Sequence, residues 1–236
     1  MGNSKHHQIY GSGPSWTMFD ENFDGADLGS PPPPSSCDAG TCDGGGWMDE
    51  WCNCQYSPIL VSIGSNKYRF TKPSNGVAFD INADGTLDQT SWTRPDSDDA
   101  FLVLDRNGNG NIDNGRELFG TATMKSNGQL AANGFEALQD LDGGLLSDGK
   151  IDQHDAVYGQ LRMWFDTNHN GWSEPAELVG LAAAGVDSLY VGYEQSQRVD
   201  QHGNSFKFKG WAFVRPQPWS TPERRRIFDV FFSIVR

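Results

Sequence analysis

The sequence has 236 residues, of which 36% are apolar, enough to bury one core and a small appendage. Its 31 acidic and 18 basic residues give a formal net charge of −13, which argues against nucleic acid as a partner. No continuous apolar run is long enough to span a bilayer, so the sequence predicts no transmembrane segment.

The N-terminal part divides into two segments. Residues 1–36 are rich in Gly and Ser, end in a run of four prolines, and show no apolar signal peptide; they predict a disordered or extended tail. Residues 37–55 form a Cys-rich segment with Cys37, Cys42, Cys52 and Cys54. An even number of closely spaced cysteines indicates two disulfides and an extracellular location, with three possible pairings and zinc as the alternative.

Residues 56–236 are expected to form one domain of α+β type. Short strands are predicted at 58–63, 68–70, 76–79, 100–104 and 227–235, with a β-hairpin from 189–193 and 205–209. Helices are predicted at 133–141, 155–164 and 175–184. The helix at 155–164 would join two calcium loops into a paired helix-loop-helix unit.

The stretch at 166–177, here loop 4, follows the ligand pattern of an EF-hand calcium loop. Oxygen-bearing side chains stand at positions one, three, five, nine and twelve, and Gly171 stands at position six, where the chain must turn sharply. The alternative is a polar surface turn. The candidate ligands, with Trp172 acting through its carbonyl, are Asp166, Asn168, Asn170, Trp172, Glu174 and Glu177.

Three further stretches follow the same pattern less completely. Loop 1 (80–91) has Ser91 in place of the closing carboxylate, so Asp96, Asp98 or Asp99 would have to fold back; otherwise it is a hairpin turn. Loop 2 (105–117) has its closing carboxylate one residue late, and Ile112 fits the short strand that pairs two such loops. Loop 3 (142–155) has two residues too many in its first half.

The candidate ligands of these loops include backbone carbonyls at position seven. They are, in loop 1, Asp80, Asn82, Asp84, Thr86 and Asp88; in loop 2, Asp105, Asn107, Asn109, Asn111, Asp113 and Glu117; in loop 3, Asp142, Asp148, Lys150, Asp152 and Asp155. Residues 80–177 carry 18 acidic and six basic side chains, a difference of 12 charges that bound cations would neutralise. The four loops predict two to four Ca²⁺ ions.

The block at 101–120 resembles a family of exported bacterial EF-hand-like modules, the calcium-dependent self-processing modules of RTX proteins. The resemblance extends over about residues 57–236 and includes the stretches at 133–135, 164–171, 174–178 and 185–186. The stretches at 200–204 and 228–232 are more similar to stand-alone secreted members. The resemblance to the self-processing modules implies calcium binding, export, and cleavage of an Asp-Pro bond at the start of the module.

The chain departs from this family at the cleavage site. Ser57-Pro58 stands where the resemblance places the scissile Asp-Pro bond, and the chain contains no Asp-Pro pair. The aspartate that would attack its own peptide carbonyl is therefore missing. The histidines His154, His169 and His202 have no zinc-protease spacing, and His169 is expected to face solvent, so we expect no enzyme activity.

The sequence thus predicts a secreted or cell-surface module that calcium folds and rigidifies. Its partner would be an unknown protein or a cell surface, and self-association is possible. Two alternatives stay open: a degenerate self-processing module that lost its scissile bond, and a non-catalytic appendage of a surface adhesin or enzyme.

Overall fold

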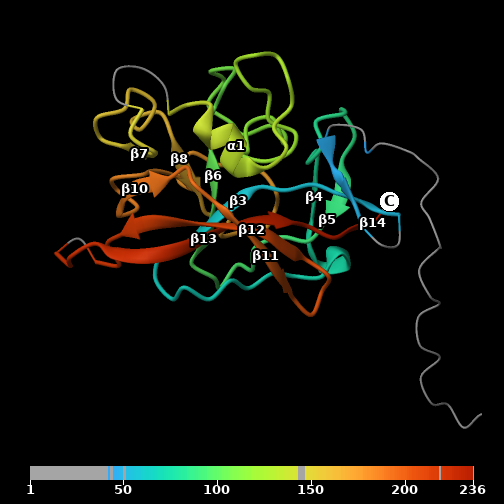
Figure 1. Cartoon of the computed structure of the whole chain (residues 1–236). Coiled ribbons are helices and arrows are strands. Elements are labelled where there is room, and N and C mark those ends of the chain that lie inside the picture. The colour runs from blue at the N-terminus through green and yellow to red at the C-terminus, as the bar shows by residue number, and fades with distance from the viewer. Residues whose placement is uncertain (1–41, 43–44, 50–51, 143–146, 218, 236) are drawn as a thin grey trace, which may run out of the picture. The chain divides into compact units, whose positions relative to one another are not determined.

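A nine-stranded antiparallel sheet forms the centre of the computed structural model, which describes residues 42, 45–49, 52–142, 147–217 and 219–235 (Figure 1). The order of its strands is β7-β10-β12-β13-β3-β6-β8-β9, and β11 pairs with β12. The bounds are β3 Ile59–Ser62, β6 Asp99–Val103, β7 Lys150–Asp152, β8 Arg162–Trp164, β9 Leu178–Gly180, β10 Val186–Tyr190, β11 Glu194–Val199, β12 Ser205–Val214 and β13 Glu223–Phe231.

Two smaller sheets accompany the large one. The first has the order β14-β5-β4, from Ile234–Val235, Asp88–Thr90 and Val77–Phe79, and a 3-10 helix at Pro73–Asn75 precedes β4. The second is the hairpin of β1 (Trp47–Met48) and β2 (Cys54–Gln55). Every strand pair in the described residues is antiparallel, and short connections join the partners that follow one another in the chain, such as β4 with β5 and β8 with β9.

Both faces of the central strands β3 and β6 are covered by apolar side chains. Alternate residues of β6 point to opposite sides, so Leu102 joins a core beneath helix α1 (Gly134–Gln139) and Phe101 joins an aromatic core on the other side. In that second core, Trp92 packs between Phe101 and Trp164 at centroid distances of 4.4 and 5.5 Å. This aromatic core lies directly beside the ends of three candidate calcium loops.

The helix predicted at 133–141 is confirmed as α1. Asn133 caps it, because its side-chain oxygen accepts a hydrogen bond from the Glu136 N–H. The predicted strands at 58–63, 76–79, 100–104 and 227–235 correspond to β3, β4, β6 and β13, whereas Phe70 makes only an isolated bridge to Thr93. The expected hairpin is also shifted: β12 turns back onto β11, and β10 pairs with the far half of β12.

The α+β class with a paired helix-loop-helix unit is wrong. The described residues contain one α-helix, of six residues, and the expected helix at 155–164 is a series of turns followed by β8. The segment at 175–184 similarly contains β9, which pairs with β8. Of the three apolar residues at helical spacing, only Trp164 lies in β8, where pairing with β6 and β9 stabilises the extended conformation.

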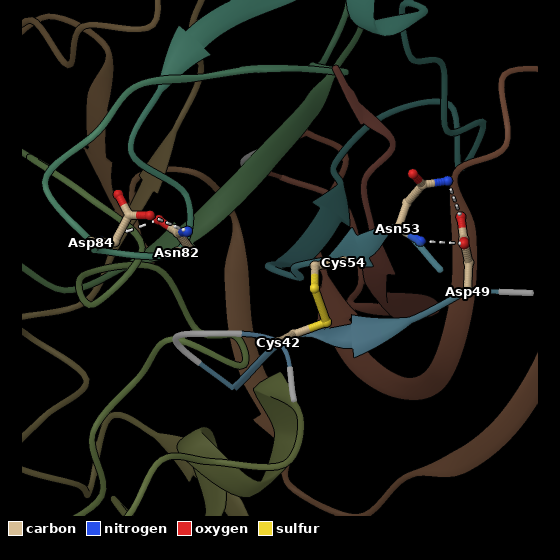
Figure 2. Close-up of a disulfide and its surroundings, with 6 residues drawn as sticks. All are labelled: Cys42, Asp49, Asn53, Cys54, Asn82 and Asp84. Carbon is tan, nitrogen blue, oxygen red and sulfur yellow. Dashed lines mark hydrogen bonds between the residues drawn. A yellow bond between two sulfur atoms is a disulfide. The ribbon is translucent and has the colours of Figure 1, made fainter. Parts of the chain in front are cut away.

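A disulfide joins Cys42 and Cys54, Cys52 is also disulfide-bonded, and no described cysteine is free. The Cys42–Cys54 bond holds the chain before β1 against β2, and Asp49 and Asn53 close the hairpin turn by two hydrogen bonds (Figure 2). Cys37 and the tail predicted at 1–36 lie outside the described residues. No helix in the described part of the chain is long and apolar enough to cross a membrane.

Candidate metal centre

Each of the four loops begins where a regular element ends. Loop 1 follows β4, loop 2 follows β6 and loop 4 follows β8, each within two residues of the last strand residue, while loop 3 follows α1. Loop 4 is the connection of a hairpin, because the Phe165 N–H donates to the Glu177 carbonyl at 3.0 Å where β8 meets β9. Loops 1 and 4 therefore belong to a strand-loop-strand frame, with β5 at the end of loop 1 and β9 following loop 4.

All four loops share one hydrogen bond, which sets their shape. In each, the carboxylate of the first aspartate accepts from the backbone N–H of a glycine with positive φ, and in loops 1, 2 and 4 the chain curls around that carboxylate. The pairs are Asp80 with Gly85 at 3.1 Å, Asp105 with Gly110 at 2.8 Å, Asp142 with Gly149 at 3.0 Å, and Asp166 with Gly171 at 2.9 Å.

The third and fifth positions of loops 1, 2 and 4 are also organised alike. Each side-chain oxygen there accepts from the backbone N–H two residues on, as in an Asx turn, at 2.7 to 3.1 Å. The residues concerned are Asn82, Asp84, Asn107, Asn109, Asn168 and Asn170. Oxygen atoms of three successive odd positions are thereby held on one wall of each loop.

The closing glutamates of loops 2 and 4 fold back across the loop entrance. Glu177 Oε1 accepts from the N–H and hydroxyl of Thr167, at 2.9 and 3.0 Å. Glu117 Oε1 accepts from the Arg106 N–H at 3.0 Å and Oε2 from the Asp113 N–H at 2.8 Å. Thus the one-residue delay in loop 2 does not prevent Glu117 from standing where Glu177 stands in loop 4.

Two buried tryptophans bind the first and last carboxylates of loop 4. The Trp92 indole N–H donates to Asp166 Oδ2 at 2.7 Å, and the Trp164 indole N–H lies 3.4 Å from Glu177 Oε2. Both tryptophans are fully buried in the aromatic core. Sequence reasoning missed both, although Trp164 precedes loop 4 by only two residues; Trp92 stands 74 residues from its partner and gives no local signal.

Loops 1, 2 and 4 contact one another. The Ile112 N–H of loop 2 donates to Ser173 Oγ of loop 4 at 2.7 Å, and the Gly115 N–H donates to the Asp80 carbonyl of loop 1 at 2.9 Å. The expectation that His169 faces solvent is wrong, since its two ring nitrogens lie 2.9 Å from the carbonyl oxygens of Thr93 and Asn75. These contacts place the three loops at one end of the aromatic core.

Loops 1 and 3 are less complete. Asp98 accepts a hydrogen bond from the Ser65 hydroxyl, and Asp99 accepts one from the Arg69 N–H. Asp96 forms ion pairs with Arg69 and Arg94, so none of these three aspartates closes loop 1. In loop 3, the Lys150 ammonium contacts the carboxylates of Asp148 and Asp152, and the Lys150 hydrogen bond lowers the pKa of Asp152 to about 2.

Loop 3 nevertheless repeats part of the pattern at its end. The Asp155 carboxylate accepts from the Asp152 N–H at 2.8 Å, in the way that Glu117 accepts from Asp113. Residues 143–146, which hold the two extra positions, lie outside the described part of the chain. The arrangement of the first half of loop 3 therefore stays a prediction.

Two buried oxygens in these loops are suited to a cation. Asp142 Oδ1 and Glu174 Oε2 are shielded from solvent and have no hydrogen-bond donor among the described residues. Over the same residues, no three His, Cys, Asp or Glu side chains converge into a metal centre by themselves. Amide and carbonyl oxygens would have to complete the coordination, as they do in EF-hand loops.

Residues 60–217 match the model of the SPM domain family. The chain is also similar to the iron-regulated protein FrpA of Neisseria meningitidis serogroup C, with 33% identity over 175 residues. That match covers 70% of this chain and 15% of FrpA, so the chain spans a small part of that relative. Because the family match takes in more than half of the sequence, this chain belongs to the SPM domain family.

Proposed function

We propose that this chain is an extracellular calcium-binding structural and interaction module without catalysis of its own. The observation that carries the proposal is the attachment of Asp166 and Glu177, at the two ends of loop 4, to the buried Trp92 and Trp164. A cation that gathers these carboxylates would also fix the position of two core side chains. Metal binding and the packing of the aromatic core are thereby coupled.

The residues present fit calcium in loops 2 and 4 best. Both loops offer only oxygen ligands, which a hard cation prefers, and both have a closing glutamate. The ligands would be Asp105, Asn107, Asn109, Asn111, Asp113 and Glu117 in loop 2, and Asp166, Asn168, Asn170, Trp172, Glu174 and Glu177 in loop 4. Bound calcium would supply charge neutralisation and a rigid bridge between the ends of each loop.

Loops 1 and 3 would follow with lower affinity, giving two to four ions in all. Loop 1 lacks a closing carboxylate, and in loop 3 the Lys150 ammonium already neutralises two acids that an ion would need. The Asn170 amide lowers the pKa of Glu174, which therefore stays anionic in loop 4. We expect loops 2 and 4 to fill first.

The decisive test is a calcium titration followed by tryptophan fluorescence and thermal unfolding. Calcium should change the emission and raise the melting temperature, and Mg²⁺ should do so weakly, because it dehydrates reluctantly and demands a tighter geometry. Trp92→Phe, which removes the indole N–H that donates to Asp166, should reduce both the emission change and the calcium-induced rise in melting temperature. Constant emission and constant melting temperature up to about 10 mM calcium, beyond the range of extracellular modules, would refute the proposal.

A degenerate self-processing module is the second candidate, and membership of the SPM family favours it. The structure packs the Ser57 carbonyl tightly against the Gly120 backbone and holds the Pro58 carbonyl by the Val230 N–H at 3.0 Å. We expect no cleavage there, because Ser57 has no carboxylate with which to attack. Incubation with calcium followed by intact mass spectrometry checks this, and a new fragment beginning at Pro58 would show that the chain is catalytic after all.

The remaining parts of the proposal concern location and partner. The Cys42–Cys54 disulfide suits an oxidising compartment, and similarity to an iron-regulated protein is compatible with export. We propose that the module acts outside the cell, where calcium at millimolar concentration would fill loops of low affinity. Its partner would be a protein or cell-surface component that docks on a surface the ions make rigid.

A further inference from the structure

A cationic and aromatic surface covers the outer face of β10, β12 and β13, outside the calcium loops. The three strands lie side by side in Figure 1. Trp211 of β12 stands opposite Arg226 of β13, and Phe213 stands opposite Arg224, so these four side chains share one face of the sheet. Tyr190 of β10 packs against Phe213 with ring centroids 6.0 Å apart. We call these five residues the Trp211 face.

The two arginines are stacked on the tryptophan ring. The guanidinium carbon of Arg224 lies 3.6 Å from the centroid of the Trp211 ring, and that of Arg226 lies 5.3 Å from it. Both side chains are exposed, and no acidic side chain in the described part of the chain forms an ion pair with either of them. Contact with the ring restricts each planar guanidinium, and the absence of an acidic partner among the described residues leaves its N–H groups available to an anion.

An open groove of about 660 Å³ adjoins this face. Its lining includes Trp211, Tyr190, Tyr193, Gln139, the ion pair of Lys209 and Glu194, and Asp148 and Gly149 of loop 3. Tyr190 and Tyr193 are 37% and 39% exposed, which leaves ring surfaces free to pack against a ligand. The groove therefore combines flat apolar rings with side chains that can exchange hydrogen bonds with hydroxyl groups.

The sign of the charge on this face is opposite to that of the whole molecule. Residues 205–226 contain six Lys or Arg, whereas the chain carries a net charge of −13. Ion pairs neutralise three of them, because Lys209 contacts Glu194, Arg215 contacts Asp187 and Arg225 contacts Glu223. The charge that is left to this face comes from Arg224 and Arg226, which have no acidic partner among the described residues. A local positive face on a strongly negative protein attracts an anion that contacts this face only. A polyanion that approached the rest of the surface would be repelled.

We propose that the Trp211 face and its groove bind an acidic polysaccharide, a chain of sugar rings bearing carboxylate groups. The aromatic rings match the flat apolar faces of sugar rings, the amide and carboxylate of Gln139 and Glu194 match hydroxyl groups, and Arg224 and Arg226 match carboxylates with bidentate geometry. This inference goes beyond the calcium proposal, because its arginines and aromatic rings lie outside the four loops. Only Asp148 and Gly149 of loop 3 line the groove, so binding is compared with calcium and with chelator.

Two other polyanions fit less well. Nucleic acid carries a negative charge on every nucleotide. Phosphates that extend beyond the narrow Trp211 face would be repelled by the negatively charged protein surface on either side of it. An anionic bilayer would bring its head groups against Glu194 and Asp148 at the groove as well as against the arginines. A polysaccharide with one carboxylate per two sugars contacts the arginines while placing neutral rings beside these acids.

The test is affinity electrophoresis of the whole chain in gels that contain hyaluronan, a polymer with alternating carboxylated sugars, or neutral dextran. Hyaluronan should retard the parent protein and dextran should not. Arg224→Gln with Arg226→Gln should weaken binding at least about tenfold, since two charge-assisted contacts are lost. The matched control is Lys72→Gln with Arg94→Gln, which removes the same charge from outside the Trp211 face and should bind like the parent.

Trp211→Ala separates the aromatic contribution from charge, and it should weaken hyaluronan binding at unchanged net charge. Thermal unfolding in the same buffer, with calcium and with chelator, checks that each variant is folded and keeps this outcome separate from the calcium proposal. No retardation of the folded parent by hyaluronan overturns the inference. The inference is also overturned if dextran retards the protein equally, or if the control pair loses hyaluronan binding to the same extent. Stronger capture by phosphatidylglycerol vesicles or by single-stranded DNA would overturn it too.

Discussion

The carboxylate of Glu177 has more structural partners than any other candidate ligand of loop 4. Its two oxygens accept from Thr167 and face the Trp164 indole, so it joins the start of loop 4, its end and the aromatic core. Replacing it by Gln keeps the volume and removes the charge that would close the site. The side chain is therefore the most direct probe of calcium coupling.

We predict that Glu177→Gln lowers the calcium-induced gain in melting temperature by about half or more, because the folded state then binds the ion less tightly. Differential scanning calorimetry at limiting and saturating calcium measures this gain. Glu223→Gln, which removes an exposed carboxylate outside the loops, is the matched control and should keep the full gain. Unfolding of Glu177→Gln at parental temperatures in both conditions would contradict a leading role for loop 4.

Asp229 is a second residue with a measurable signature, since it is fully buried on β13. Burial raises its pKa to about 7, opposed by the Gly134 N–H, which donates to Oδ2 at 2.9 Å, and by the nearby Ser57 hydroxyl. Burial, the main cause, also raises the pKa of Asp99 to about 7. Both groups hold a proton more tightly in the folded state than in the unfolded chain.

This difference in proton binding determines whether the free energy of unfolding rises or falls with pH. The stability that protonated Asp229 provides is fully present below the unfolded pKa and is lost as the pH rises through about 7. In chelator, the free energy of unfolding should therefore fall between about pH 4 and 7, by at most about 1.4 kcal/mol per pH unit for each group. Urea unfolding across this range should show a smaller slope for Asp229→Asn. Asp96→Asn, whose parent carboxyl has a lowered pKa, should leave the slope unchanged.

At the scale of elements, the curl of loop 4 depends on packing against β4 as well as on backbone conformation. Gly171 and Gly108 both have φ of 74°, but a Cβ at Gly171 would meet Val77 Cγ2 at 3.1 Å, whereas a Cβ at Gly108 meets nothing within 4 Å. The two glycines form a matched pair. They share the left-handed conformation and differ in what lies beside it.

We predict that Gly108→Ala costs about 1 kcal/mol, the usual penalty for the left-handed conformation, and that Gly171→Ala costs about 1 to 2 kcal/mol more. Chemical denaturation without calcium measures both. Equal costs would mean that loop 4 does not press on β4. The comparison thus tests whether loop 4 packs tightly against β4 before any ion binds.

For the whole molecule, we predict that calcium binds with dissociation constants of about 10⁻⁵ to 10⁻³ M, because asparagines occupy positions where tighter loops use carboxylates. Isothermal titration calorimetry gives the constants, and native mass spectrometry counts the ions. A nanomolar constant would contradict the assignment of these loops as weak sites. Sites that fill together would indicate that the contacts among loops 1, 2 and 4 transmit binding.

Much of the candidate site could be predicted from the sequence alone, because the pattern of a loop is local. The spacing of Asp166, Asn168, Asn170 and Gly171 sets which side chain can accept from which backbone N–H, and these bonds form in loop 4. Calcium binding at these residues stays a prediction. The cap at Asn133 and the buried strand β6 are local in the same sense. Each depends on residues within a few positions of one another.

Only the tertiary structure decided the class of the fold and the partners of the loops. The segment at 155–164 has apolar residues that suit either a helix or a strand, and pairing of β8 with β6 and β9 resolves the choice. The bond from Trp92 to Asp166 and the contact of loop 2 with loop 4 join residues 74 and 61 positions apart. The physical reason is that the free energy of such contacts comes from packing, which local sequence spacing does not encode.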